Sequence, residues 1–180
     1  YIGTNGVVAY GIIMYVGFIF VGTYMGYAVG SAPVISYHYG AGNKDELKNL
    51  FKRSLTIIIV SSVVMTLIAE IIAGYLAGIF VSYDNNLLEL TTEAIRIYAV
   101  SYLISGVNIF ASSFFTALNN GVVSAVISFM RMFVFQIVMI LLLPVVLGIS
   151  GIWTAVIAAE VLSVVISVMF LVKNRKKYRY

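Results

Sequence analysis

Residue types that carry chemistry in many enzymes are scarce in this chain of 180 residues. It has no cysteine, which excludes disulfides, thiolate chemistry and cysteine-bound metals. His38 is the single histidine, and no second ligand accompanies it at a spacing typical of metal sites. The chain has no GxSxG motif, and Gly40-Ala41-Gly42 lacks the Gly-Lys-Ser/Thr of a P-loop. We therefore expect no enzyme activity, no cofactor and no metal site.

Charge is also scarce: charged residues make up 10% of the chain and hydrophobic residues 62%. Ordinary soluble domains are about 25% charged and about 45–50% apolar. A soluble fold of this size needs a polar surface that this composition cannot supply, so the composition indicates an integral membrane protein. The net charge of +4 is concentrated beside apolar runs and forms no basic face with base-reading groups. We expect the lipid bilayer, and no nucleic acid, as a partner.

Long apolar runs occupy most of the sequence. A membrane-spanning helix needs about 20 mainly apolar residues, and five runs meet this requirement. Their expected limits are residues 11–36, 55–81, 95–117, 122–147 and 152–172. The runs are too long and too uniformly apolar for barrel strands, and only helices or closed barrels satisfy the backbone in hydrocarbon. The sequence therefore predicts an all-α fold with five transmembrane helices joined by short turns.

Nine of the eleven basic residues lie in two clusters. One cluster separates the first two spans and the other follows the fifth: Lys44, Lys48, Lys52, Arg53, Lys173, Arg175, Lys176, Lys177 and Arg179. Four spans separate the clusters, so both fall on one face, which the positive-inside rule makes cytoplasmic. We expect a multi-pass protein of the plasma or inner membrane with a cytoplasmic C-terminal tail. On the opposite face, Asp84 is expected to cap the helix that follows it.

Three ionisable residues interrupt the apolar runs: Glu70, Arg131 and Glu160. By helical rise, Glu160 lies about 12 Å and Arg131 about 14 Å from the start of its span, near the middle of a hydrocarbon core about 30 Å thick. Because a short turn joins their spans, we expect the two to pair in a cavity. The sequence leaves two alternatives open, in which Arg131 snorkels to the headgroups and Glu160 makes a structural hydrogen bond. Glu70, nearer the external side, is interpreted as structural.

A polar stripe follows the third predicted span at intervals of three and four residues. Its members are Tyr98, Ser101, Ser105, Asn108 and Ser112. This spacing puts all five on one helical face, and a polar face inside a membrane contacts protein or water rather than lipid. We expect this face to line a cavity, with interhelical hydrogen bonding, worth about 0.6 kcal/mol on average, as the alternative.

The first predicted span carries small residues and tyrosines. Gly22, Gly26 and Gly30 are spaced by four, which predicts close packing of helices. Pro33 cannot donate to the carbonyl of Val29, so we expect a kink there that is a candidate hinge. Several tyrosines are candidates for cation–π contact with a cationic ligand, with interface belts and core packing as the alternative. They are Tyr10, Tyr15, Tyr24, Tyr27, Tyr98 and Tyr102.

Residues 33–43, PVISYHYGAGN, resemble the segment that closes the second helix of each six-helix lobe in multidrug and toxic compound extrusion (MATE) transporters. Later segments resemble the same family in order and spacing: residues 117–121 (ALNNG), Arg131, residues 143–144, residues 148–153 (GISGIW) and Glu160. The resemblance implies that residues 1–180 are part of the C-terminal lobe, with spans corresponding to about helices 8–12 of twelve. The odd span number and external start likewise predict a piece of a longer protein.

The resemblance further implies an antiporter that exports cationic or amphipathic compounds in exchange for H⁺ or Na⁺. It implies a missing N-terminal lobe as partner and a small cationic or amphipathic substrate. Some relatives place acidic residues in helices seven and ten, or an aspartate in helix one. Here those helices are absent or lack an interior carboxylate, so the coupling ion stays unassigned and Glu160 is the acidic candidate.

Two other functions remain open from the sequence. A lipid-linked sugar flippase of the same superfamily would carry more basic charge in its central cavity than the single Arg131. A non-transporting membrane scaffold would pack by its glycines and would not need the polar stripe between Tyr98 and Ser112.

Overall fold

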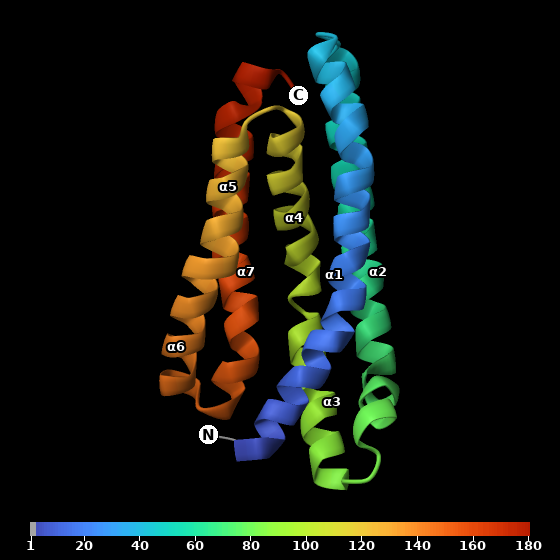
Figure 1. Cartoon of the computed structure of the whole chain (residues 1–180), viewed down its shortest axis with the longest axis vertical. Helices are drawn as coiled ribbons and strands as arrows, with labels where there is room; N and C mark the ends of the chain where they lie inside the picture. The colour runs from blue at the N-terminus through green and yellow to red at the C-terminus, as the bar shows by residue number, and fades with distance from the viewer. Residues whose placement is uncertain (1–2) are drawn as a thin grey trace.

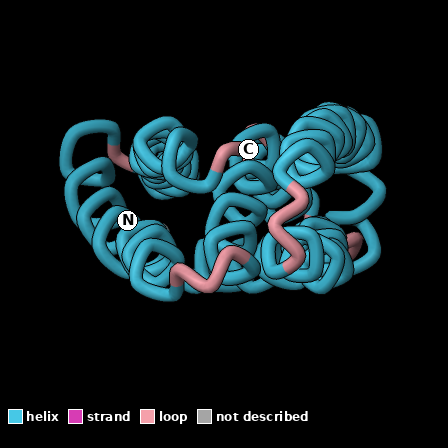
Figure 2. Tube along the Cα trace, turned by 90° about the horizontal axis from the view of Figure 1, so that it is seen from above, coloured by secondary structure: helices cyan, strands magenta, loops and turns pink. Residues whose placement is uncertain are grey.

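The computed structural model describes residues 3–180, which form helices and short turns with no strand in that range. The helices are α1 (Gly3–Gly40), α2 (Lys44–Val81), α3 (Asn85–Ala99), α4 (Tyr102–Ala117), α5 (Gly121–Phe129), the π-helix η1 (Met130–Phe135), α6 (Gln136–Leu147) and α7 (Ile149–Tyr178). They run along the long axis of an elongated bundle (Figure 1). Viewed along that axis, short loops join them at the two ends (Figure 2). The all-α prediction is confirmed.

Four stretches of residues 3–180 are long and apolar enough to cross a membrane by themselves: α1, α2, the continuous helix Gly121–Leu147 and α7. The fifth predicted span corresponds to α3 and α4 together, which bend by 47° at a short break. The structure differs from the predicted run at residues 95–117 in two respects. Helix begins ten residues earlier, at Asn85, and it is interrupted at Val100 and Ser101.

The turns on either side of α2 follow from local side-chain chemistry. In the α1–α2 turn, Gly42 has a φ of +69°, a conformation that suits glycine because it has no Cβ. Asn43 then caps α2 by accepting a hydrogen bond from the Glu46 backbone N–H at 3.2 Å. The predicted cap at Asp84 is confirmed, since its Oδ1 accepts from the backbone N–H groups of Asn86 at 2.9 Å and Leu87 at 3.2 Å.

Hydroxyl groups donate to carbonyl groups around the break between α3 and α4, where the last carbonyls of α3 lack partners in their own helix. Side chains from other helices supply donors, as Thr66 of α2 donates to the Ala99 carbonyl at 3.3 Å and Tyr24 of α1 donates to the Tyr102 carbonyl at 3.1 Å. Within the same segment, the Ser105 hydroxyl donates to the Ser101 carbonyl at 2.9 Å. Irregular backbone is tolerated in a membrane only where protein groups satisfy it, and the bond from Thr66 to the Ala99 carbonyl meets this need at the end of α3.

Helix α4 is the centre of the bundle, in contact with α1, α2, α5 and α7. Its residues Phe110, Phe114 and Phe115 are fully buried. Gly106 allows the close approach of α1 and α2, because a Cβ there would lie 2.8 Å from Ser62 Oγ and 3.1 Å from Tyr24 Cδ1. The position of α4 therefore depends on a small residue facing one side and large aromatic residues filling the others.

Within residues 3–180, no helix packs against the glycine seam predicted for the first span. Gly22, Gly26 and Gly30 are exposed, and a Cβ built on any of them would meet nothing within 4 Å. Close packing of α1 instead involves Gly17, where a Cβ would contact the Tyr102 hydroxyl at 3.5 Å. Pro33 lies inside α1 without ending it, and the visible change of direction in Figure 1 lies in the darker, N-terminal half of that helix.

The hairpin between α6 and α7 requires two glycines. Gly148 has a φ of +61°, and a Cβ on Gly151 would collide with the Leu143 carbonyl group and Pro144 backbone. Backbone atoms cannot give way as a flexible side chain does, so only glycine fits at Gly151. This hairpin sets α7 antiparallel to the Gly121–Leu147 helix, and thereby sets the relative position of Glu160 and Arg131.

We expect Gly151→Ala to lower the free energy of unfolding by about 1–3 kcal/mol, the usual range for overpacking. Gly22→Ala is the matched control, since its new Cβ meets no atom and its helix propensity improves. Denaturation of the purified full-length protein in detergent compares the two variants. Equal stability of Gly151→Ala and Gly22→Ala would contradict the tight hairpin.

Candidate functional site

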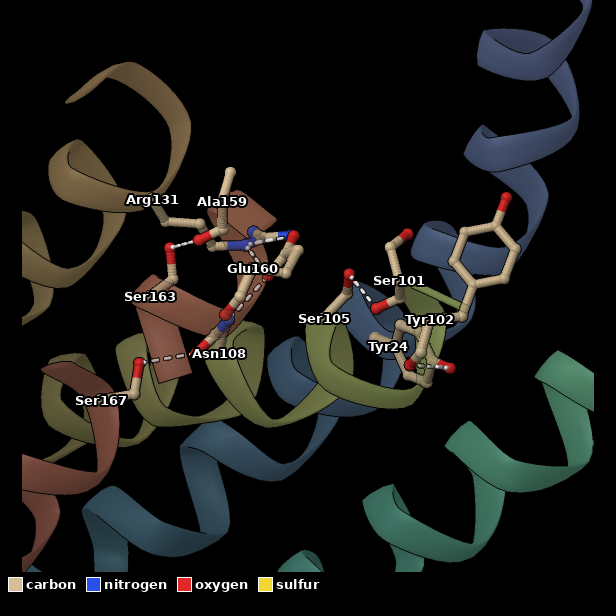
Figure 3. A network of polar contacts seen from close by, with 10 residues as sticks. All are labelled: Tyr24, Ser101, Tyr102, Ser105, Asn108, Arg131, Ala159, Glu160, Ser163 and Ser167. Carbon is tan, nitrogen blue, oxygen red and sulfur yellow. Dashed lines mark hydrogen bonds and ion pairs between the residues drawn. The ribbon is translucent and has the colours of Figure 1, made fainter. Parts of the chain in front are cut away.

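A buried ion pair joins Arg131 of η1 to Glu160 of α7 (Figure 3). Arg131 Nη2 lies 2.7 Å from Glu160 Oε1, and Arg131 Nε lies 2.9 Å from Oε1 and 3.0 Å from Oε2. The guanidinium thus donates through two nitrogens of one edge to both oxygens of the carboxylate, a geometry that gives strong, directional hydrogen bonds. The pairing expected from the sequence is confirmed, and the alternative of a snorkelling Arg131 does not describe this side chain.

Asn108 of α4 completes the surroundings of the carboxylate. Its Nδ2 donates to Glu160 Oε2 at 2.6 Å and to the Glu160 carbonyl at 3.1 Å. Its Oδ1 accepts from the Ser167 hydroxyl at 2.8 Å. Asn108 is fully buried, and no amide atom of this residue lacks a partner. One network therefore connects α4, η1 and α7 through Glu160.

The burial of this network determines its energetic character. The Glu160 side chain is 8% exposed, while the Arg131 side chain is 18% exposed. An isolated charge in such a place is strongly disfavoured, whereas a paired and hydrogen-bonded one is tolerated. Removing one partner of a buried pair costs about 3–5 kcal/mol, because the other charge is left uncompensated. Glu160 and Arg131 therefore depend on each other for charge balance.

Arg131 lies in a stretch of π-helix, Met130–Phe135, within the long helix Gly121–Leu147. Hydrogen bonds of the i→i+5 type are rare and usually occur as single turns, frequently at functional sites. The π turn shifts the helical face that follows it relative to the face before it. The sequence contains no glycine or proline at Met130–Phe135 that would have signalled this irregularity.

The ion pair forms part of the wall of a cavity of about 540 Å³. Side chains of α1, α3, α4, α5, η1, α6 and α7 line it: Tyr10, Met14, Val21, Met25, Ala28, Val29, Tyr98, Asn108, Ile109, Ser112, Ser113, Thr116, Ile127, Ser128, Arg131, Met132, Gln136, Val156 and Glu160. The wall is mostly apolar, with a few polar groups that converge on one region. This combination is typical of sites for small organic ligands.

A cluster of hydroxyl groups extends the polar wall between α4 and α5. The Ser112 hydroxyl lies 2.7 Å from that of Ser128 and 2.9 Å from that of Ser124, and Thr116 Oγ1 lies 2.7 Å from Ser124 Oγ. Sequence reasoning missed Ser124, Ser128 and Thr116. Ser124 and Ser128 are spaced by four residues and so lie on one helical face, which was the available signal. That face lies opposite the predicted stripe on α4.

The predicted polar stripe divides into two groups. Tyr98, Asn108 and Ser112 line the cavity, as expected. Ser101 and Ser105 do not, because they are buried at the α3–α4 break, where the Ser105 hydroxyl satisfies the Ser101 carbonyl. The break changes the helical phase between Tyr98 and Ser105, so one uninterrupted helical face was the wrong assumption for these five residues.

The candidate tyrosines are likewise separated by the fold. Tyr10 and Tyr98 line the cavity. Tyr24 and Tyr102 are buried in the core, and Tyr27 donates to the Ser54 hydroxyl at 3.0 Å. Tyr15 is 69% exposed and does not line the cavity. Core packing and the outer surface therefore account for four of these six side chains.

The other polar candidates lie outside this site. Glu70 of α2 does not line the cavity, and neither does His38 at the end of α1. Among residues 3–180, no group of three His, Cys, Asp or Glu side chains is placed to hold a metal ion. Glu160, Asn108 and the Ser112 cluster are among the residues that bring acceptor oxygens to the cavity wall.

Comparison with solved structures shows which proteins share this arrangement of helices. The Vibrio cholerae MATE transporter VcmN in its bent form superposes with a TM-score of 0.89 at 18% sequence identity, covering 98% of this chain and 40% of that one. A multidrug resistance MATE family transporter of the MOP superfamily matches in an outward-facing conformation with a TM-score of 0.91 at 17% identity, again covering 98% and 40%. An inward-facing conformation of such a transporter gives 0.83 at 16% identity, covering 95% and 39%.

These likenesses establish the fold, and the chain spans about 40% of the length of the transporters it matches. No curated protein matches the sequence. The family model MatE, however, matches residues 1–142, which is well over half of the chain. Together with the helical membrane fold, this match shows that the chain belongs to the MatE family.

Proposed function

We propose that this chain is part of the C-terminal lobe of a secondary-active antiporter that exports cationic or amphipathic compounds in exchange for H⁺ or Na⁺. The observation that carries the proposal is the buried carboxylate of Glu160, which Arg131 and Asn108 hold at the wall of the cavity. Ionisable groups inside membrane bundles are costly and characteristically mark ion or substrate paths. The matched MATE transporters, two of which are described as multidrug resistance transporters, support transport as the function.

The chemistry of exchange follows from the charge balance at Glu160. In a medium of low polarity, the carboxylate is stable when one positive partner neutralises it. Arg131 is that partner in the structure described here. A proton or Na⁺ at Glu160 would compete with Arg131, and a cationic substrate in the cavity would compete with both. Mutually exclusive neutralisation of one carboxylate is a sufficient physical basis for coupling two cation movements in opposite directions.

The rest of the cavity wall suits an amphipathic cation. Its volume of about 540 Å³ falls within the range of about 300–1,000 Å³ for small-molecule sites. Tyr10 and Tyr98 provide aromatic faces for cation–π contact. Met14, Met25 and Met132 add flexible, polarisable side chains that adapt to different apolar shapes. These features support a substrate class defined by positive charge and apolar surface.

The alternative functions receive less support from this geometry. A flippase for a phosphate-linked lipid needs free positive charge in its cavity, yet Arg131 is the one basic residue among the described residues that line it, and Glu160 neutralises it. A scaffold subunit does not require a charge pair beside a cavity. Both observations favour the antiporter.

We further propose that the C-terminal tail is cytoplasmic, in a plasma or inner membrane. The α1–α2 turn and the end of α7 lie at the same end of the bundle (Figure 1). This arrangement brings together the two clusters that hold nine of the eleven basic residues. The positive-inside rule assigns such an end to the cytoplasm.

The first test of function is Glu160→Gln in the full-length protein, which removes the negative charge while keeping the shape of the side chain. We expect ethidium efflux to fall by about tenfold or more, within the range typical of lost coupling between sites. Glu70→Gln is the matched control, because Glu70 lies outside the cavity. Wild-type efflux by Glu160→Gln, at equal protein level in the membrane, would remove Glu160 from the mechanism.

A double-mutant cycle separates the stability of the ion pair from its function. We expect Glu160→Gln and Arg131→Gln each to lower the free energy of unfolding by about 3–5 kcal/mol, since each leaves its partner uncompensated. The double variant should lose less stability than the sum of the two single losses, by about 1–3 kcal/mol. It should nevertheless remain inactive in efflux. Detergent denaturation and efflux assays provide the two readouts. Additive stability losses would contradict the pair, and active double variants would contradict its role in exchange.

Single cysteines test the orientation, because residues 1–180 contain none of their own. In intact cells, a membrane-impermeant maleimide should label Asn86→Cys, and it should label Lys176→Cys only after the membrane is permeabilised. Both positions are exposed, and the start of α3 and the end of α7, to which they belong, lie at opposite ends of the bundle (Figure 1). Any native cysteines elsewhere in the full-length protein are first replaced. The reverse labelling pattern would overturn the proposed topology without affecting the role of Glu160.

A further inference from the structure

A second cavity, of about 200 Å³, lies at the basic end of the bundle, between the start of α2 and the end of α7. Its lining residues share no member with the first cavity: Lys48, Phe51, Lys52, Leu171, Val172, Arg175 and Tyr180. We refer to these seven residues as the basic groove. Nothing in the ion pair or in the proposed exchange requires it.

The two walls of the basic groove have matching patterns. Lys48 and Lys52 are one helical turn apart on α2, and Leu171 and Arg175 are one turn apart on α7. Each wall therefore presents positive charge to the same space. Arg175 belongs to the last turn of α7, and Lys48 and Lys52 belong to the first turns of α2, so the groove lies where the helices leave the apolar layer.

Aromatic side chains form a fixed, apolar floor. The Tyr180 hydroxyl donates to the Leu171 carbonyl at 2.8 Å. The Tyr180 ring packs against Phe51 with centroids 4.6 Å apart and against Phe114 with centroids 4.8 Å apart. Burial among these groups raises the pKa of the Tyr180 hydroxyl, so it stays a neutral donor. Beside this floor, Val172 is 68% exposed, which leaves apolar surface directed outward from the groove.

The positive charge of the basic groove is not neutralised within residues 3–180. None of Lys48, Lys52 and Arg175 forms an ion pair there, and no acidic side chain lines the groove. Glu46, on the first turn of α2, instead accepts a hydrogen bond from Asn49 at 3.3 Å. Three cations around an apolar floor are complementary to a ligand that combines a negative head with an apolar body.

We propose that the basic groove binds the anionic headgroup of a phospholipid in the adjacent leaflet. The phosphate takes hydrogen bonds and charge from Lys48, Lys52 and Arg175, while the first part of an acyl chain covers Phe51 and Val172. Charge-assisted bonds from arginine and lysine suit phosphate oxygens. The position at the end of the membrane-spanning helices, and the apolar surface next to the cations, favour a lipid over a soluble phosphate compound.

A lipid in this groove would connect two parts of the bundle. Helix α2 packs on α1, α3 and α4, whereas α7 packs on α3, α4, α5, η1 and α6. A headgroup held by Lys52 and Arg175 bridges α2 and α7 directly. Bound anionic lipid should therefore raise the melting temperature of the protein, by preferential binding to the folded state.

The test uses the full-length protein, purified in neutral detergent and supplied with phosphatidylglycerol or with phosphatidylcholine. Native mass spectrometry counts retained lipid, and a melting curve reports stability. We expect the triple variant K48Q/K52Q/R175Q to lose phosphatidylglycerol retention by about tenfold or more, since each basic residue near an anionic surface contributes about fivefold. The stabilisation by phosphatidylglycerol should disappear with it. Because all three side chains are exposed and lack hydrogen-bond partners within residues 3–180, the variant should fold.

The matched control is K173Q/K176Q/R179Q, which removes the same charge from exposed positions at the same end but outside the groove. Wild-type retention by this control supports the proposal, and equal loss in both triple variants overturns it in favour of diffuse attraction. Inorganic phosphate and glycerol phosphate distinguish the source of the ligand. Stabilisation by these soluble anions that matches phosphatidylglycerol would overturn the assignment to a lipid. If the triple variant does not fold, the single variants K52Q and R175Q take its place, and the single variant K176Q is their control.

Discussion

The negative charge of Glu160, inside a bundle that crosses a membrane, is the constraint on which the rest of the structure depends. Such a charge persists only with a positive partner and saturated hydrogen bonding, and Arg131 and Asn108 supply both. These three residues come from α7, η1 and α4, so satisfying one carboxylate fixes three helices relative to one another. The tight glycine hairpin before α7 and the π turn at Met130–Phe135 are the local features that bring the partners to their positions.

Helix α4 links the Glu160 network to α1 and α2, because it contacts both of these helices as well as α7. Its N-terminal end bends away from α3, and hydroxyl groups of Thr66 and Tyr24 satisfy carbonyls at the break. Its middle presents Asn108 to Glu160, and its C-terminal half is surrounded by aromatic side chains. The Ala99 carbonyl at the break and the side chains of the Glu160 network therefore have hydrogen-bond partners, and a bent helix remains compatible with an apolar surrounding. The cavity lies along α4 because this helix has polar groups on the side that faces α5, η1 and α7.

The two cavities lie at different places, one in the middle of the bundle and one at its basic end, and different side chains line them. In the middle, a single carboxylate is paired with Arg131 at a cavity wall, which is the geometry behind the proposed exchange of cations. At the basic end, three unpaired cations surround an aromatic floor and suit a negative partner instead. The middle site therefore holds a paired carboxylate, whereas the site at the basic end holds cations without an acidic partner among residues 3–180.

Much of this was predictable from the sequence, because hydropathy and charge act over long runs. Apolar length determined the all-α membrane fold, turn chemistry determined the cap at Asp84, and depth along two neighbouring spans brought Arg131 and Glu160 together. Tertiary structure alone decided the break at Ser101, the π turn at Arg131 and the exposure of Gly22, Gly26 and Gly30. Regular periodicity assumes an unbroken helix with one buried face. The chain departs from that periodicity where a hydroxyl group of another helix satisfies a carbonyl, or where a carboxylate of another helix holds a guanidinium. Those partners are distant in sequence, so the periodicity of one segment does not reveal them.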